Sequence, residues 1–162
     1  MAATSATCSR IARAIPNCRA MVTAIASLAL DHQAYLGDTL VGIAAEKAGI
    51  AKRDVPLVTQ SYPRDVTQRV AEVAAKAGAL LIPRGSRWAI HADAGELHYC
   101  DAQGELVLPL PHLPGEHQWL NAGLAVAMLR HQSTLGVSQA ALCRAMTGTR
   151  WPGRLQHLER GV

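Results

Sequence analysis

Three short apolar runs, partly β-branched, are spaced along the first half of the chain: residues 21–28, 55–60 and 79–82. Runs of this length and composition are typical of strands that are buried on both faces of a sheet. Between the first two, a helix is predicted from Asp38 or Thr39 to about Ala48. Between the second and third, Asp65 is predicted to cap a helix that ends at Gly78. This alternation predicts an α/β fold with a mostly parallel sheet and flanking helices.

The second half of the chain has a different pattern. Residues 87–108 hold three short β-like segments separated by Asp- and Gly-containing turns, which predicts a small antiparallel β insertion. Three prolines then break the chain between residues 109 and 114. Beyond them, one helix is predicted over about 116–132 and a last one, capped by Ser138, that ends at Gly148.

Composition narrows the class of protein. Of the 162 residues 49% are hydrophobic and 17% are charged, which is typical of a globular chain. The net charge of +4 is uneven, because residues 1–20 carry three arginines and no acid, whereas the rest carries 13 basic and 12 acidic residues. A nearly neutral body argues against a nucleic-acid partner. No apolar run approaches the roughly 18 residues of a membrane helix, so no membrane partner is expected.

The first twenty residues differ in composition from the rest of the chain. Their Ala, Ser and Arg content is typical of a mitochondrial transit peptide, and a disordered or out-of-frame leader is the alternative that we favour. The four cysteines form no CxxC pair, which favours free thiols in a reducing cytoplasm.

Asp31 and His32 come directly after the first predicted strand. In open α/β sheets ligands bind at the carboxyl ends of strands, and an imidazole with a nearby carboxylate suits a metal. The alternative is that Asp31 caps a turn and His32 is solvated.

Lys47 shares a helical face with Leu40, Ile43 and Ala44. Burial on such a face would lower the pKa of the amine, so that it acts as a base or takes up carbon dioxide as a carbamate that ligates magnesium. The alternative is a lysine of the last turn that extends to solvent and is stabilised by the helix dipole.

His117 and Asn121 lie one turn apart at the start of the helix after the prolines. An Asn amide pairs a donor with an acceptor and can contact an adenine edge; helix capping is the alternative. Arg154 comes after the last helix, where it could clamp a phosphate or belong to a linker.

Three segments in this order, LALDHQAYLGDTLVGIAAEKAGI, LPGEHQWLNAGLAVAMLR and WPGRLQ, resemble the folylpolyglutamate synthase/dihydrofolate synthase family of the Mur ligase superfamily. The resemblance covers about residues 22–160. It implies an incomplete Mur-ligase-type central domain with residues 87–108 as its β insertion. It also implies ATP-dependent addition of L-glutamate to dihydropteroate or a folate through an acyl phosphate, with ADP and phosphate released.

The resemblance also implies roles for single residues. His32 would ligate Mg²⁺, Lys47 would be the carbamylated lysine at the metal, and Asp31 would support them. ATP would be contacted by Asn121 at the base, by Arg154 from the hinge, and weakly by His117.

The resemblance divides the chain into an atypical leader (1–20), a partial central ATPase domain (21–150) and a hinge (151–162). The family's glycine-rich phosphate loop has no counterpart here, since GxxxxGK[ST] is absent. We therefore expect the chain alone to be inactive, with a complementary chain that carries the loop as a partner. The alternative is a non-catalytic remnant or partner-binding module with weak nucleotide binding.

Overall fold

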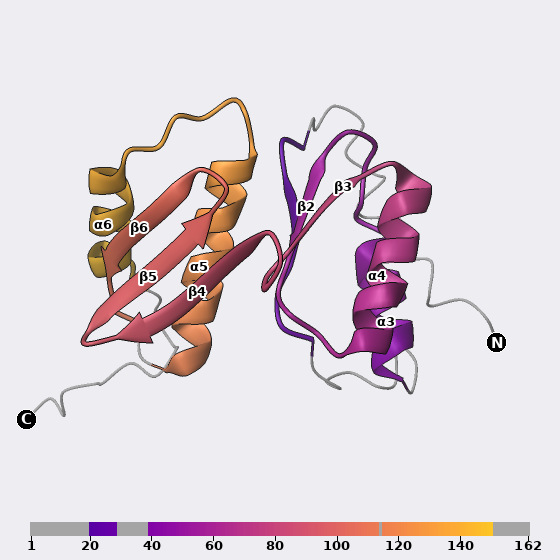
Figure 1. Cartoon of the computed structure of the whole chain (residues 1–162), viewed down its shortest axis with the longest axis horizontal. Coiled ribbons are helices and arrows are strands. Elements are labelled where there is room, and N and C mark those ends of the chain that lie inside the picture. Colours follow the sequence, from indigo (N-terminus) through magenta and orange to yellow (C-terminus); the bar gives the residue numbers. More distant parts are fainter. Residues whose placement is uncertain (1–19, 29–38, 114, 151–162) are drawn as a thin grey trace, which may run out of the picture.

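The computed structural model describes residues 20–28, 39–113 and 115–150 (Figure 1). Three strands form a parallel sheet in the order β1-β2-β3: β1 (Thr23–Ile25), β2 (Pro56–Thr59) and β3 (Leu80–Pro83). Between them lie α3 (Leu40–Ala48) and α4 (Arg64–Ala77). The predicted parallel strands and both helices are confirmed.

The ends of these helices are set by local chemistry, with one correction to the prediction. Thr39 caps α3, because its hydroxyl oxygen accepts a hydrogen bond from Gly42 N at 3.1 Å. Gly78 ends α4 at φ +73°, a left-handed conformation that glycine adopts without strain. The prediction that Asp65 caps α4 is wrong: Pro63 occupies the cap position and the helix starts at Arg64, two residues earlier than predicted, so Asp65 lies in the first turn.

The second half forms an antiparallel sheet, which we call the meander sheet. It comprises β4 (Trp88–Asp93), β5 (Glu96–Asp101) and β6 (Gly104–Pro109), paired in sequence order. Ala94 and Gly95 both have positive φ, as a two-residue hairpin turn with the twist of the strands requires. The predicted β insertion is confirmed, and α5 (Glu116–His131) and α6 (Gln139–Gly148) come after it.

Two cores hold the elements together on opposite faces of β2. Leu57 and Val58 are neighbours with no exposed surface, and they point to opposite faces. α3 and α4 cover the Leu57 face, whereas α5 and the meander sheet lie on the Val58 side (Figure 1). Burial on both faces explains why β2 is apolar at successive positions rather than at alternate ones.

α5 approaches the meander sheet closely at Gly123. A Cβ atom at this position would lie 2.4 Å from Ile90 Cδ1, so the absence of a side chain permits the contact between α5 and β4. Among the helices of the described ranges, none has the length and apolar character needed to cross a membrane.

Candidate functional site

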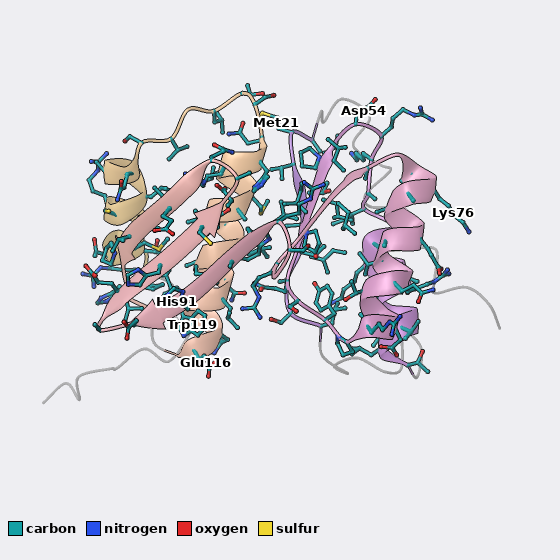
Figure 2. All side chains as sticks on the ribbon, viewed as in Figure 1. Met21, Asp54, Lys76, His91, Glu116 and Trp119 are labelled. Atoms are coloured by element: carbon teal, nitrogen blue, oxygen red, sulfur yellow. The ribbon has the colours of Figure 1, made fainter. Side chains whose placement is uncertain are left out.

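The strands of the parallel sheet all end at the same edge, where ligands bind in open α/β folds. From this edge the chain leaves β2 at Gln60 and β3 at Arg84. Figure 2 shows Met21 and Asp54, which precede β1 and β2, at one end of the molecule, and Glu116 and Trp119 at the other. α5 therefore begins near the carboxyl edge of the sheet.

α5 is largely buried but exposes one strip. His117, Asn121 and Ala125 succeed one another at intervals of four residues and are exposed, whereas Leu124 and Ala127 are buried. Gly115 occupies the cap position, so Asn121 lies in the second turn and does not cap the helix. Within the described ranges the Asn121 amide makes no hydrogen bond, which leaves its donors and acceptor open to a ligand.

Lys47 lies in the last turn of α3 and is half-buried. Ile43 and Ala44 on the same face have no exposed surface, so the lysine extends from the edge of a buried stripe. Lys52 is also half-buried, whereas Lys76 is exposed. Burial therefore distinguishes Lys47 from Lys76 but not from Lys52.

The other predicted site residues, Asp31, His32 and Arg154, lie outside the described residues. Over 20–28, 39–113 and 115–150, no group of three His, Cys, Asp or Glu side chains is arranged to hold a metal ion. The described residues alone thus form no metal centre.

Two polar residues that sequence reasoning missed lie beyond the ends of β2 and β3. Gln60 is only 3% exposed, and its amide nitrogen donates to the Leu120 carbonyl of α5 at 2.8 Å. Gln60 Oε1 and Arg84 Nε are buried and have no hydrogen-bond partner in the described part of the chain. The sequence signal that could have identified both residues is a long polar side chain directly after an apolar strand.

Tyr62 ties the end of β1 to the chain that leaves β2. Its hydroxyl lies 2.8 Å from Ile25 O and 2.7 Å from Ala26 O, so its single proton is shared between two carbonyls. Burial raises the pKa of this phenol well above its usual range, and a backbone hydrogen bond from Gln60 opposes it only in part. Tyr62 therefore stays neutral and acts as a structural donor.

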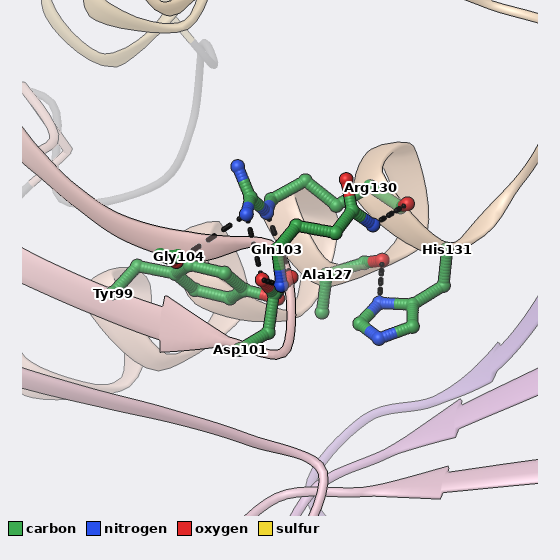
Figure 3. A network of polar contacts seen from close by, with 7 residues as sticks. All are labelled: Tyr99, Asp101, Gln103, Gly104, Ala127, Arg130 and His131. Atoms are coloured by element: carbon green, nitrogen blue, oxygen red, sulfur yellow. Dashed lines mark hydrogen bonds and ion pairs between the residues drawn. The ribbon is translucent and has the colours of Figure 1, made fainter.

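A second polar cluster joins the meander sheet to the far end of α5 (Figure 3). Arg130 donates to both carboxylate oxygens of Asp101 at 2.6 and 2.7 Å. Tyr99 Oη and Gln103 N add bonds of 3.0 and 2.8 Å to the same carboxylate. The cluster lies thirteen residues along α5 from His117, about 20 Å at the helical rise, so it belongs to the scaffold.

A hollow of about 470 Å³ opens beside the start of α5. It is lined mostly by apolar residues: Leu110, Pro111, Leu113, Gly115, Glu116 and Trp119. Glu116 and Trp119 lie on a different side of the helix from Asn121, so the hollow and the exposed strip are separate features.

Comparison with known proteins agrees with the motifs, although no family model matches. The dihydrofolate synthase/folylpolyglutamate synthase of Escherichia coli is 36% identical over 136 residues, which is 83% of this chain and 31% of that protein. The folylpolyglutamate synthase of Lacticaseibacillus casei is 28% identical over 85% of this chain and 34% of its own.

Solved structures give the same result. E. coli FolC in complex with DHPP and ADP matches with a TM-score of 0.76 and 36% identity over 86% of this chain and 32% of that one. A bifunctional folylpolyglutamate synthase/dihydrofolate synthase with Mn, AMPPNP and L-glutamate bound matches with a TM-score of 0.73 and 34% identity over 86% and 32%. The chain spans about a third of the length of these relatives. By sequence, motif order and fold, it belongs to the folylpolyglutamate synthase/dihydrofolate synthase family.

Proposed function

We propose that this chain forms part of an ATP-dependent C–N ligase that adds L-glutamate to dihydropteroate, to folylpolyglutamate, or to both, with release of ADP and phosphate. The observation that carries the proposal is the exposed strip of α5 at the carboxyl edge of the parallel sheet, with an open Asn121 amide. This strip lies in a segment matched by a relative solved with ADP.

Asn121 would contact the base of ATP. A carboxamide offers an N–H donor and a C=O acceptor side by side, which complements the acceptor and amino donor on an adenine edge. His117 lies one turn earlier on the same strip and would contact the nucleotide weakly. Arg154 comes after α6 in the chain and would contact ATP as a cation from the hinge.

The roles of His32, Lys47 and Asp31 toward Mg²⁺ stay predictions, since no described group of residues completes a metal centre. When bound, the ion would neutralise charge on the transferring phosphoryl oxygens. The division into a leader, a partial ATPase domain over 21–150 and a hinge over 151–162 is likewise a proposal, as is a cytoplasmic location.

Titration calorimetry of the purified chain with ADP and Mg²⁺ tests the proposal. We expect saturable binding that Asn121→Ala weakens by about tenfold, the value of one amide–base pair. Gln139→Ala removes an exposed amide from α6 and should leave binding unchanged. Absence of saturable binding below roughly 1 mM, or an Asn121→Ala variant that binds as before, would contradict the proposal.

Glutamate-dependent release of ADP, with dihydropteroate as acceptor, gives the second readout. The chain alone should give no release, because the family's phosphate loop has no counterpart in it. Release after addition of a complementary chain that carries this loop would support the ligase. Asn121-dependent binding without release in that mixture would favour the alternative, a module that binds nucleotide without turning it over.

A further inference from the structure

Gln60 makes a contact between the two parts of the candidate site. It comes directly after β2 at the carboxyl edge, and its side chain reaches across to α5, 60 residues further along the chain. The acceptor is the carbonyl of Leu120, the residue directly before Asn121. One hydrogen bond of 2.8 Å thus ties the sheet edge to the helical turn that presents the Asn121 amide.

A purely structural role does not explain why a glutamine occupies this buried position. The side chain is 3% exposed, and its Oε1 atom is buried with no partner among the described residues. A buried acceptor that lost its bonds to water without gaining others costs free energy. Leucine is similar in size, has no polar atoms and would avoid this cost.

Loss of the Gln60 bond need not damage the helix. Leu120 lies inside α5, so its carbonyl also lies within reach of the backbone N–H four residues later. The amide of Gln60 is therefore an additional donor, and its removal leaves the carbonyl with its helical partner. The bond contributes to the placement of α5 rather than to its formation.

We propose that Gln60 is a positioning residue for nucleotide selection: it holds the second turn of α5 against the sheet edge, so that Asn121 meets the base at a defined distance from the groups at that edge. This rests on the proposed function, in which Asn121 contacts adenine. The selected class is adenine nucleotides over guanine nucleotides. Guanine presents two acceptors where adenine presents an acceptor and a donor, so a carboxamide held in place distinguishes them.

The test compares Gln60→Leu, Asn121→Ala and the double variant, with Gln139→Leu as the matched control. Gln139 also donates from its amide to a backbone carbonyl, that of Val107 at 3.0 Å, but from an exposed position on α6. Affinities for Mg²⁺–ADP and Mg²⁺–GDP are measured by calorimetry. Thermal unfolding is followed for each variant.

We expect Gln60→Leu to unfold at the same temperature as the unaltered chain or above it, because it removes a buried oxygen that has no partner among the described residues. Its preference for ADP over GDP should nevertheless fall several-fold, toward that of Asn121→Ala. The double variant should show no further loss, since the two residues act through one contact. Gln139→Leu should keep the full preference.

The outcomes separate the two proposals. If Asn121→Ala leaves ADP binding unchanged, or the unaltered chain binds no ADP, the proposed function fails, and this inference fails with it. If Asn121→Ala lowers the preference while Gln60→Leu keeps it, only the role of Gln60 is overturned. A Gln60→Leu variant that unfolds at a lower temperature and keeps its base preference would show that Gln60 is structural.

Discussion

The Asp101 carboxylate accepts hydrogen bonds from three parts of the chain. Its side chain has no exposed surface and accepts from Arg130 on α5, from Tyr99 on its own strand and from the backbone of Gln103 in the next turn. The Arg130 guanidinium also lies 5.5 Å from the centre of the Tyr99 ring. The charge on Asp101 is thus compensated inside the protein, which makes the pair sensitive to the loss of either member.

Asp101→Ala should therefore be strongly destabilising. The substitution leaves a largely buried guanidinium and a buried phenol without their acceptor, and we expect a loss of about 3 kcal/mol in the free energy of unfolding. Urea titration followed by circular dichroism measures it. Glu72→Ala breaks the exposed Arg69–Glu72 pair of α4 and should leave the midpoint nearly unchanged. Equal effects of the two substitutions would contradict the internal character of the Asp101 pair.

The same carboxylate predicts a pH dependence. Burial by itself raises the pKa of Asp101, but hydrogen bonds from Arg130, Gln103 N and Tyr99 outweigh it and hold the pKa below its usual range. A folded-state pKa below the unfolded value of about 3.9 stabilises the fold above that pH, and this stability is lost as pH falls through the folded pKa.

Urea midpoints measured between neutral and strongly acidic pH test this. The unaltered chain should lose more stability below about pH 4 than Asp101→Asn, which has no proton to gain at this position. If the urea midpoints of the two proteins fall by the same amount as the pH is lowered, Asp101 has the same pKa in the folded and unfolded states, which would contradict the prediction.

At the scale of elements, the position of α5 depends on how closely its backbone approaches β4 and the end of β2. Gly123 faces Ile90 of β4, and Gln60 reaches the helix from the other side. α5 thus lies between the two sheets, and any shift of the helix changes both contacts. This arrangement places a glycine in a helix interior, where alanine would otherwise be favoured.

Gly123→Ala should destabilise the protein by about 1–2 kcal/mol, because the cost of overpacking against Ile90 exceeds the gain in helix propensity. Ile90→Val in the same chain should recover part of the loss, since it removes the Cδ1 atom that lies 2.4 Å from the new Cβ. Gly148→Ala, at a helical glycine with nothing within 4 Å, is the control and should be neutral or stabilising. Additive effects of the first two substitutions would contradict a direct clash.

At the scale of the whole molecule, β2 joins the two cores. Leu57 packs with α3 and α4, and Val58 packs with the side that holds α5 and the meander sheet. A strand of four residues thus carries side chains of both cores. If either core unfolds, β2 loses the packing on one of its faces, and the other core loses the support of the same strand. The two halves should therefore unfold together.

Leu57→Ala tests this coupling. Removal of a fully buried leucine should cost about 2–5 kcal/mol. The loss should lower the urea midpoint seen by tryptophan fluorescence, to which Trp88 and Trp119 of the other core contribute, as much as the midpoint seen by circular dichroism. Separate midpoints for the two probes would show that the cores unfold independently.

The sequence alone predicted the elements where each signal is local. Unbroken apolar runs indicated the buried parallel strands, turn residues separated the meander strands, and Thr39, Gly78 and Ser138 marked helix ends that the structure confirms. Asp65 failed as a cap because Pro63 starts the helix first. The motif order identified the family, and Lys47 and Asn121 fall on the predicted helices, while their roles stay predictions.

Contacts between distant segments were decided only by the tertiary structure. Gln60 and Leu120 are 60 residues apart, and Asp101 and Arg130 are 29 apart, so neither pair leaves a periodic trace in the sequence. The glycine that lets α5 approach β4 looks unfavourable in a helix until the neighbouring Ile90 is in place. Local patterns reflect the hydrogen bonding and burial of one element, which depend on neighbouring residues. The placement of one element against another depends on the shape and polarity of both partners, and these meet only once the chain has folded.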